Sequence, residues 1–212
     1  MSQAAQKFSL VLGEGKEDLA VLQKVAEAGE INGLRYKEYG GKNKLKSFLN
    51  MEQKAPEYTS GRIKRILITR DADENWQAAW DAASGAAQNI FGVVISAPGE
   101  WQQIENGPQV SIWIAPSRDK EGMIETLCLE AAKNTDSDTF DCLETYVECL
   151  QTKHQIELHE KERFEIWTIA AQGSAMGRRR LPFSEAITRL PIDWSNSAFT
   201  EIKDLLDATS AS

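Results

Sequence analysis

Short apolar runs alternate with amphipathic helical patterns over the first two-thirds of the chain, and this alternation limits the possible folds more than any other feature. The runs with the length and composition of buried strands are 8–12, 34–39, 63–69 and 110–114. The segments with a helical period between and after them are 17–29, 42–51, 75–87 and 122–133. Strands that alternate with helices predict an α/β fold, with a mainly parallel sheet and helices on both of its faces.

The pattern becomes wholly helical after about residue 134. Amphipathic stretches cover residues 140–151, 160–172 and 197–208, and residues 171–180 (AQGSAMGRRR) have the composition of a mobile loop. We therefore expect an α/β domain over residues 1–135 and a helical C-terminal extension over residues 136–212 that packs on it.

Charge is distributed unevenly along the chain. The net charge of −8 argues at first against a nucleic-acid partner. However, residues 35–65 hold nine Lys and Arg against three Glu, whereas residues 119–165 hold thirteen Asp and Glu against five Lys and Arg. Two interpretations stay open at this point: two solvated faces of opposite sign, or separate basic and acidic binding surfaces.

Nothing in the sequence indicates a membrane or secretory segment. The apolar runs are far shorter than the roughly 20 residues that span a bilayer, and the first ten residues, MSQAAQKFSL, lack the pattern of a secretory signal. The three cysteines, Cys128, Cys142 and Cys149, have no CxxC spacing, so a disulfide framework and a zinc knuckle are both disfavoured. These features predict a cytoplasmic protein without a membrane partner.

Acidic side chains follow two of the predicted strands. Glu14 follows the first strand, and Asp71 and Asp73 follow the strand at 63–69. Ligands of parallel sheets bind beyond the carboxyl ends of the strands, so these three carboxylates converge if the two strands are neighbours. Such a cluster repels itself, and a hard divalent cation with oxygen ligands, Mg²⁺ or Mn²⁺, explains it best. The competing interpretation makes Glu14 and Asp18 ordinary first-turn helix acids and Asp73 a helix N-cap.

Lysines near these acids are candidates for binding the phosphates of nucleic acid. Lys16 follows Glu14 by two residues, and Lys42 follows a Gly-Gly pair at the end of a predicted strand. Lys44 and Lys46 continue the same basic segment. Lys64, in contrast, begins a strand and should lie at the opposite end of the sheet.

Four segments carry a resemblance to a known group of domains. Residues 10–18 (LVLGEGKED) resemble the first motif of the Toprim (topoisomerase–primase) domain, and residues 66–73 (ILITRDAD) resemble the second. The Glu-Gly-Lys-x-Asp form is most similar to that of the small ribosomal-RNA maturases. Residues 111–116 (SIWIAP) and 122–125 (GMIE) are similar to a small prokaryotic Toprim-like family of uncharacterised function. The likeness covers roughly residues 7–135.

The resemblance implies a Toprim fold in which Glu14, Asp71 and Asp73 surround Mg²⁺ and carry phosphoryl-transfer chemistry. Glu14 is alternatively a general acid/base, as proposed for its position in the family. Asp18 and Glu125 would bind a second ion. Glu125 is the candidate for the acid that opens a helix in a similar place, and helps to bind metal, in the overcoming-lysogenization-type nucleases.

Two function hypotheses follow from the resemblance. Neither the tyrosine context of a topoisomerase nor the zinc-binding domain of a primase is present. The first hypothesis is therefore a metal-dependent nuclease or phosphotransferase that acts on DNA or RNA. The second is a non-catalytic Toprim-like sensor or scaffold whose acidic segment, 119–165, binds a partner protein. We attach a role in phage defence to both as an expectation.

Overall fold

Residues 7–157, 165–166, 168, 170 and 182–210 are described by the computed structural model. One five-stranded sheet, in the order β2-β1-β3-β5-β4, forms its centre. The strands are β1 (Phe8–Gly13), β2 (Leu34–Glu38), β3 (Ile63–Asp71), β4 (Gln102–Gln103) and β5 (Gln109–Ala115). Strands β2, β1, β3 and β5 are parallel, and the short β4 pairs antiparallel with β5. The predicted α/β fold with a mainly parallel sheet is confirmed.

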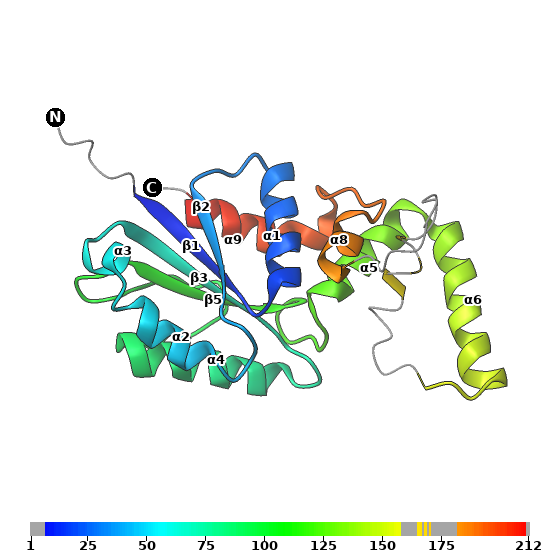
Figure 1. The fold of residues 1–212 in the computed structure, drawn as a ribbon, viewed down its shortest axis with the longest axis horizontal. Helices are drawn as coiled ribbons and strands as arrows, with labels where there is room; N and C mark the ends of the chain where they lie inside the picture. The colour runs from blue at the N-terminus through cyan, green and yellow to red at the C-terminus, as the bar shows by residue number, and fades with distance from the viewer. Residues whose placement is uncertain (1–6, 158–164, 167, 169, 171–181, 211–212) are drawn as a thin grey trace.

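Helices cover both faces of the sheet, as Figure 1 shows. They are α1 (Lys16–Ala28), α2 (Leu45–Glu52), α3 (Pro56–Thr59), α4 (Trp76–Phe91), α5 (Ile124–Thr135), α6 (Ser137–Lys153), α8 (Phe183–Thr188) and α9 (Thr200–Ser210), with a 3₁₀ turn η1 (Ser197–Phe199) before α9. Helices α1 and α9 lie on one face, and α2 and α4 lie on the other.

Alternation along the strands divides the core into two layers. Along β3, Leu67 packs on the side of α1 and α9, whereas its neighbours Ile66 and Ile68 pack on the side of α2 and α4. All three side chains are fully buried. Successive strand residues point to opposite faces, and both faces are covered, so the central residues of β1 (10–12), β3 (66–68) and β5 (112–114) are apolar at consecutive positions.

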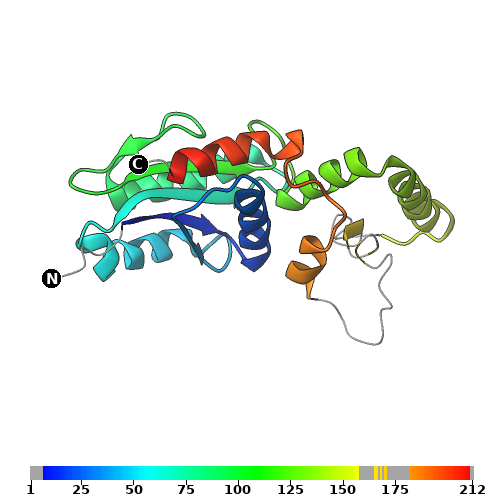
Figure 2. The ribbon, with the colours of Figure 1, turned by 90° about the horizontal axis from the view of Figure 1, so that it is seen from above.

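The C-terminal third of the chain leaves the sheet and then returns to it. Helix α6 projects beyond the sheet at the end opposite the two chain termini (Figures 1 and 2). Helix α9 packs against β1 and β3 beside α1, with Ile202 and Leu206 buried. The last helix of the predicted extension therefore completes one face of the sheet. The predicted loop at 171–180, and most of the helix predicted at 160–172, lie outside the described residues.

Among the residues that the structure describes, no helix is both long enough and apolar enough to cross a membrane.

Candidate functional site

Strands β1 and β3 are neighbours, and this brings the two acidic motifs to the same edge of the sheet. Leu12 of β1 pairs in register with Ile68 of β3. Glu14 comes directly after the last residue of β1, and Asp71 is the last residue of β3. Both strands are parallel, so their carboxyl ends meet at one edge. The sequence analysis predicted that the acids converge if these two strands are neighbours, and the strands are neighbours.

Two helices add buried acids to this edge. Asp18 lies in the first turn of α1 and is 8% exposed, and Glu125 lies in the first turn of α5 and is 2% exposed. We call Asp18, Asp71 and Glu125 the inner acids. Burial raises the pKa of Asp71 well above its usual range, and the negative charges of Asp18, Glu125 and Glu14 raise it further. The inner acids and Glu14 therefore interact electrostatically as one group.

The same causes act on the other acids of the group. Burial raises the pKa of Asp18 to about 7, and the charges of Glu125 and Glu14 add to that effect. Burial also raises the pKa of Glu14, but the guanidinium of Arg70 opposes this rise. Ionising the whole group is thus costly, because each charge is desolvated and faces others of the same sign.

Each of three acids accepts a hydrogen bond from the backbone. Asp71 Oδ1 accepts from Ile124 N at 3.0 Å, at the first residue of α5, and Asp18 Oδ2 accepts from Gly15 N at 2.8 Å. Glu14 Oε1 accepts from Lys42 N at 2.8 Å. Asp18 is therefore a first-turn helix acid, as the competing interpretation held, as well as a member of the group. That interpretation is wrong for Asp73, because the N-cap of α4 is Asn75.

A turn after β2 closes over Glu14. Gly40 N and Gly41 N donate to the main-chain oxygen of Glu14 at 3.0 and 3.1 Å. Both glycines have positive φ, +81° and +111°, which side chains with a Cβ rarely adopt. The two glycines let the chain turn sharply enough for Lys42 to reach Glu14. This confirms that Lys42 lies near the acids.

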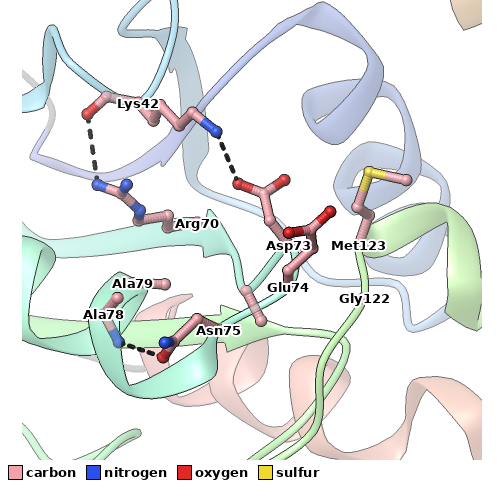
Figure 3. Close-up of a pocket in the computed structure, with 10 residues that line it drawn as sticks. Lys42, Arg70, Asp73, Glu74, Asn75, Ala78, Ala79, Gly122 and Met123 are labelled. Atoms are coloured by element: carbon pink, nitrogen blue, oxygen red, sulfur yellow. Dashed lines mark hydrogen bonds and ion pairs between the residues drawn. The ribbon is translucent and has the colours of Figure 1, made fainter. Parts of the chain in front are cut away.

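Lys42 connects three residues of the site, as Figure 3 shows in part. Its Nζ lies 3.1 Å from Asp73 Oδ2, and its main-chain oxygen accepts a hydrogen bond from Arg70 Nη1 at 3.3 Å. Its N–H is the donor to Glu14. Asp73 has a φ of +50° and forms an isolated bridge with Gly122, which precedes α5. The Asp73 carboxylate is exposed and faces Lys42.

A hollow of about 650 Å³ lies beside the acids, within the range of small-molecule sites. We call it the Lys42–Arg70 hollow. Figure 3 shows Lys42 and Arg70 on one side of it and Gly122 and Met123 on the other. The remaining lining residues are Ala72, Asp73, Glu74, Asn75, Ala78 and Ala79.

Only one of the four lysines predicted to bind phosphate lines the hollow. Lys42 lines the hollow, whereas Lys16, Lys44 and Lys46 are exposed and do not. Arg70 was not singled out by sequence reasoning. Its position directly before Asp71, at the end of a strand, was the signal that could have found it.

The five acidic side chains have the right chemistry to bind a hard cation, but in this structure they are not arranged to coordinate one. All five acids supply carboxylate oxygens, the ligands that Mg²⁺ and Mn²⁺ prefer. Within the described part of the chain, however, no group of three or more His, Cys, Asp or Glu side chains is placed to hold a metal ion. Asp18, Asp71 and Asp73 are turned toward protein donors instead.

A family model described as "Protein of unknown function (DUF3226)" matches residues 9–210. This span includes all five acids and every strand residue of the sheet except Phe8. No curated protein and no solved structure matches the chain.

Proposed function

This chain belongs to the DUF3226 family of proteins of unknown function, and we propose that it is a Mg²⁺- or Mn²⁺-dependent nuclease or phosphotransferase with a Toprim-like site. The observation that carries the proposal is the group formed by Glu14 and the three inner acids. Two strand ends and two helix starts bring these carboxylates together at one edge of the sheet. In α/β proteins this edge is where ligands bind.

Among the described residues, the positive side chains that act on this group lie at its margin, beside Glu14. Arg70 and Lys42 lower the pKa of Glu14, which lies at the margin. For Asp18 and Asp71, the main influences that favour the charged form are backbone N–H groups. Backbone dipoles offset only part of the cost of several buried charges. A bound divalent cation would supply positive charge beside Asp18 and Asp71, which supports a metal-dependent activity.

The residues of the site divide into holding and positioning roles. Glu14, Asp71 and Asp73 would hold one cation, and Asp18 with Glu125 a second. When bound, the cation would stabilise negative charge on a phosphoryl group and lower the pKa of a water molecule. Lys42 and Arg70 are placed to hold phosphate oxygens at the margin. Glu14, with its raised pKa and with Oε1 occupied by the Lys42 N–H, is suited to exchange a proton at Oε2.

The proposal also includes a substrate class, a cellular location and a biological role. We assign the activity to DNA or RNA in the cytoplasm, with phage defence as its setting.

A second candidate, a non-catalytic sensor or scaffold, is supported by two observations. At least four of the five acids, Glu14, Asp18, Asp71 and Asp73, accept hydrogen bonds from protein donors, and the described residues contain no assembled metal-binding group. Helix α6 also projects from the sheet, and its exposed acids are Asp138, Asp141, Glu144 and Glu148. This acidic helix would then be the surface for a basic protein partner.

Titration with Mn²⁺ separates the two candidates. We expect Mn²⁺ to raise the melting temperature of the wild type and to permit cleavage of mixed nucleic acids. Asp71→Asn should lose both effects, while its neutral amide oxygen can still accept the Ile124 N–H. The matched control is Asp207→Asn, on the exposed side of α9, which should respond like the wild type. Equal metal responses in all three proteins, without cleavage, would favour the scaffold.

A further inference from the structure

Arg70, which lines the Lys42–Arg70 hollow, carries a donor that the described residues do not satisfy. Arg70 donates through Nη1 to the main-chain oxygen of Lys42, but its Nε is buried and has no hydrogen-bond partner among the described residues. A buried N–H without an acceptor is costly, and it is more so on a charged group. The Nε edge of a guanidinium is also one of the edges that binds an oxyanion through two parallel hydrogen bonds.

Lys42 brings a second cation that is available to a ligand. Its Nζ pairs with Asp73, but the side chains of the two residues are 54% and 43% exposed. An exposed ion pair of this kind contributes little to stability, so exchange of Asp73 for a ligand anion is inexpensive. The backbone of Lys42 stays tied to Glu14 and Arg70 through its N–H and C=O. Only the side chain of Lys42 needs to move.

The charges around the hollow favour one compact anion over an extended one. A nucleic-acid backbone needs a continuous basic track, since each phosphate is neutralised separately. Of the residues described as lining the hollow, only Lys42 and Arg70 are positive, while Asp73 and Glu74 are negative. A phosphate monoester concentrates a charge of about −1.5 to −2 on one group, which the two positive charges of the lining can match.

We propose that the Lys42–Arg70 hollow binds a phosphate monoester carried by a nucleotide. Lys42 Nζ and the Arg70 guanidinium hold the phosphate oxygens, and the nucleoside packs toward Met123, Ala78 and Ala79 on the remaining lining. The volume of about 650 Å³ accommodates a ligand of that size. The inference rests on the proposed function and deepens it, because it makes the phosphorylated end of a strand, or a free mononucleotide, the substrate group.

Binding of matched oligonucleotides tests the proposal without any turnover. Fluorescent single-stranded 12-mers that carry a 5′-phosphate, a 3′-phosphate or hydroxyls at both ends are compared by anisotropy in EDTA, with a nucleoside monophosphate and inorganic phosphate as competitors. We expect a phosphorylated end to bind about tenfold more tightly than the hydroxyl form. Lys42→Met and Arg70→Gln should each remove that preference. Competition by the mononucleotide would identify the free nucleotide as the source, and its absence the strand end.

Matched variants keep the result interpretable. Lys44→Met removes an exposed lysine that does not line the hollow, and it should keep the preference. Arg70→Lys retains the charge without the planar fork, and it should lose most of the preference while folding like the wild type. Equal affinity for phosphorylated and hydroxyl ends, or a preference that survives in the Lys42→Met/Arg70→Gln double variant, would overturn the proposal.

The outcome is separable from that of the proposed function. A phosphate preference without any Mn²⁺-dependent cleavage would uphold the binding site and remove the nuclease. Cleavage that Asp71→Asn abolishes, without a phosphate preference, would do the reverse.

Discussion

Two regions of this protein bury carboxylates, and the groups that surround the buried negative charge differ between them. Glu52 of α2 is 2% exposed, and Lys37 Nζ of β2 binds both of its oxygens, at 2.7 and 2.9 Å. Asp18 is buried as well, at 8% exposed, yet the side-chain charges that act on it are those of Glu125 and Glu14, which raise its pKa. Glu52 has a cation from its own chain, which is sufficient for a structural role. Among the described residues, Asp18 and Asp71 are arranged as if a cation were to come from outside.

The largest effect should come from adding a divalent cation. At a free Mn²⁺ concentration of about 100 times its dissociation constant, ligand linkage stabilises the native state by about 2.7 kcal/mol. We expect that increment in the wild type and in Glu52→Gln, because Lys37 and Glu52 lie outside the acidic group. Asp71→Asn should lack it. Urea denaturation with and without Mn²⁺ measures the difference, and an equal gain in Asp71→Asn would show that the ion binds elsewhere.

Removing one charge should have opposite consequences in the two regions when metal is absent. Glu52→Gln breaks the ion pair with Lys37 and should cost about 1–3 kcal/mol, discounted from a fully buried pair because the Lys37 side chain is 39% exposed. Asp71→Asn removes a repulsive charge and keeps an acceptor for Ile124 N, so its stability should be equal to or slightly above that of the wild type. Urea midpoints in EDTA decide this. A clear loss in Asp71→Asn would make that acid structural.

Stability of the metal-free protein should fall as the pH rises from about 5 to 7.5. The pKa of Asp18 is about 7 in the folded protein, above its usual value of 3.8. Between these two values the folded state binds more protons than the unfolded state, so each step up in pH favours unfolding. The loss of stability that comes from ionising Asp18 is complete above pH 7. Asp18→Asn should flatten this slope while its amide oxygen still accepts the Gly15 N–H. A wild-type midpoint that rises over the same range would contradict the electrostatic description.

The smallest effect should come from the exposed margin of the site. Asp73→Asn removes the ion pair with Lys42, whose side chain is 54% exposed, so stability should change by less than about 1 kcal/mol. If the unfolding midpoint shifts as much as in Glu52→Gln, then the Lys42–Asp73 pair is a structural element. In that case Lys42 is not available to a phosphate.

The strand ends and their acids were predictable from the sequence because their causes are local. Buried strands in a parallel sheet must be apolar, and Glu14 and Asp71 stand where two such runs end. Asp18 and Glu125 were named from the family resemblance, and their burial at the starts of α1 and α5 could not be derived from spacing alone. The predicted lysines were less informative, since an exposed lysine has the same local pattern whether or not it lines a hollow.

What the sequence by itself determined is the alternation of strands and helices, and with it the edge of the sheet at which the acids lie. Only the tertiary structure decided which groups face one another there. The place of β2 beside β1 brings the Gly40–Lys42 turn over Glu14, and the positive φ of Asp73 turns its carboxylate to Lys42. Likewise, α9 covers β1 and β3 although nearly two hundred positions separate it from β1 along the chain. Contacts of this kind depend on strand order and on packing between distant segments, whereas hydrophobic periodicity reports only on each segment's own surroundings.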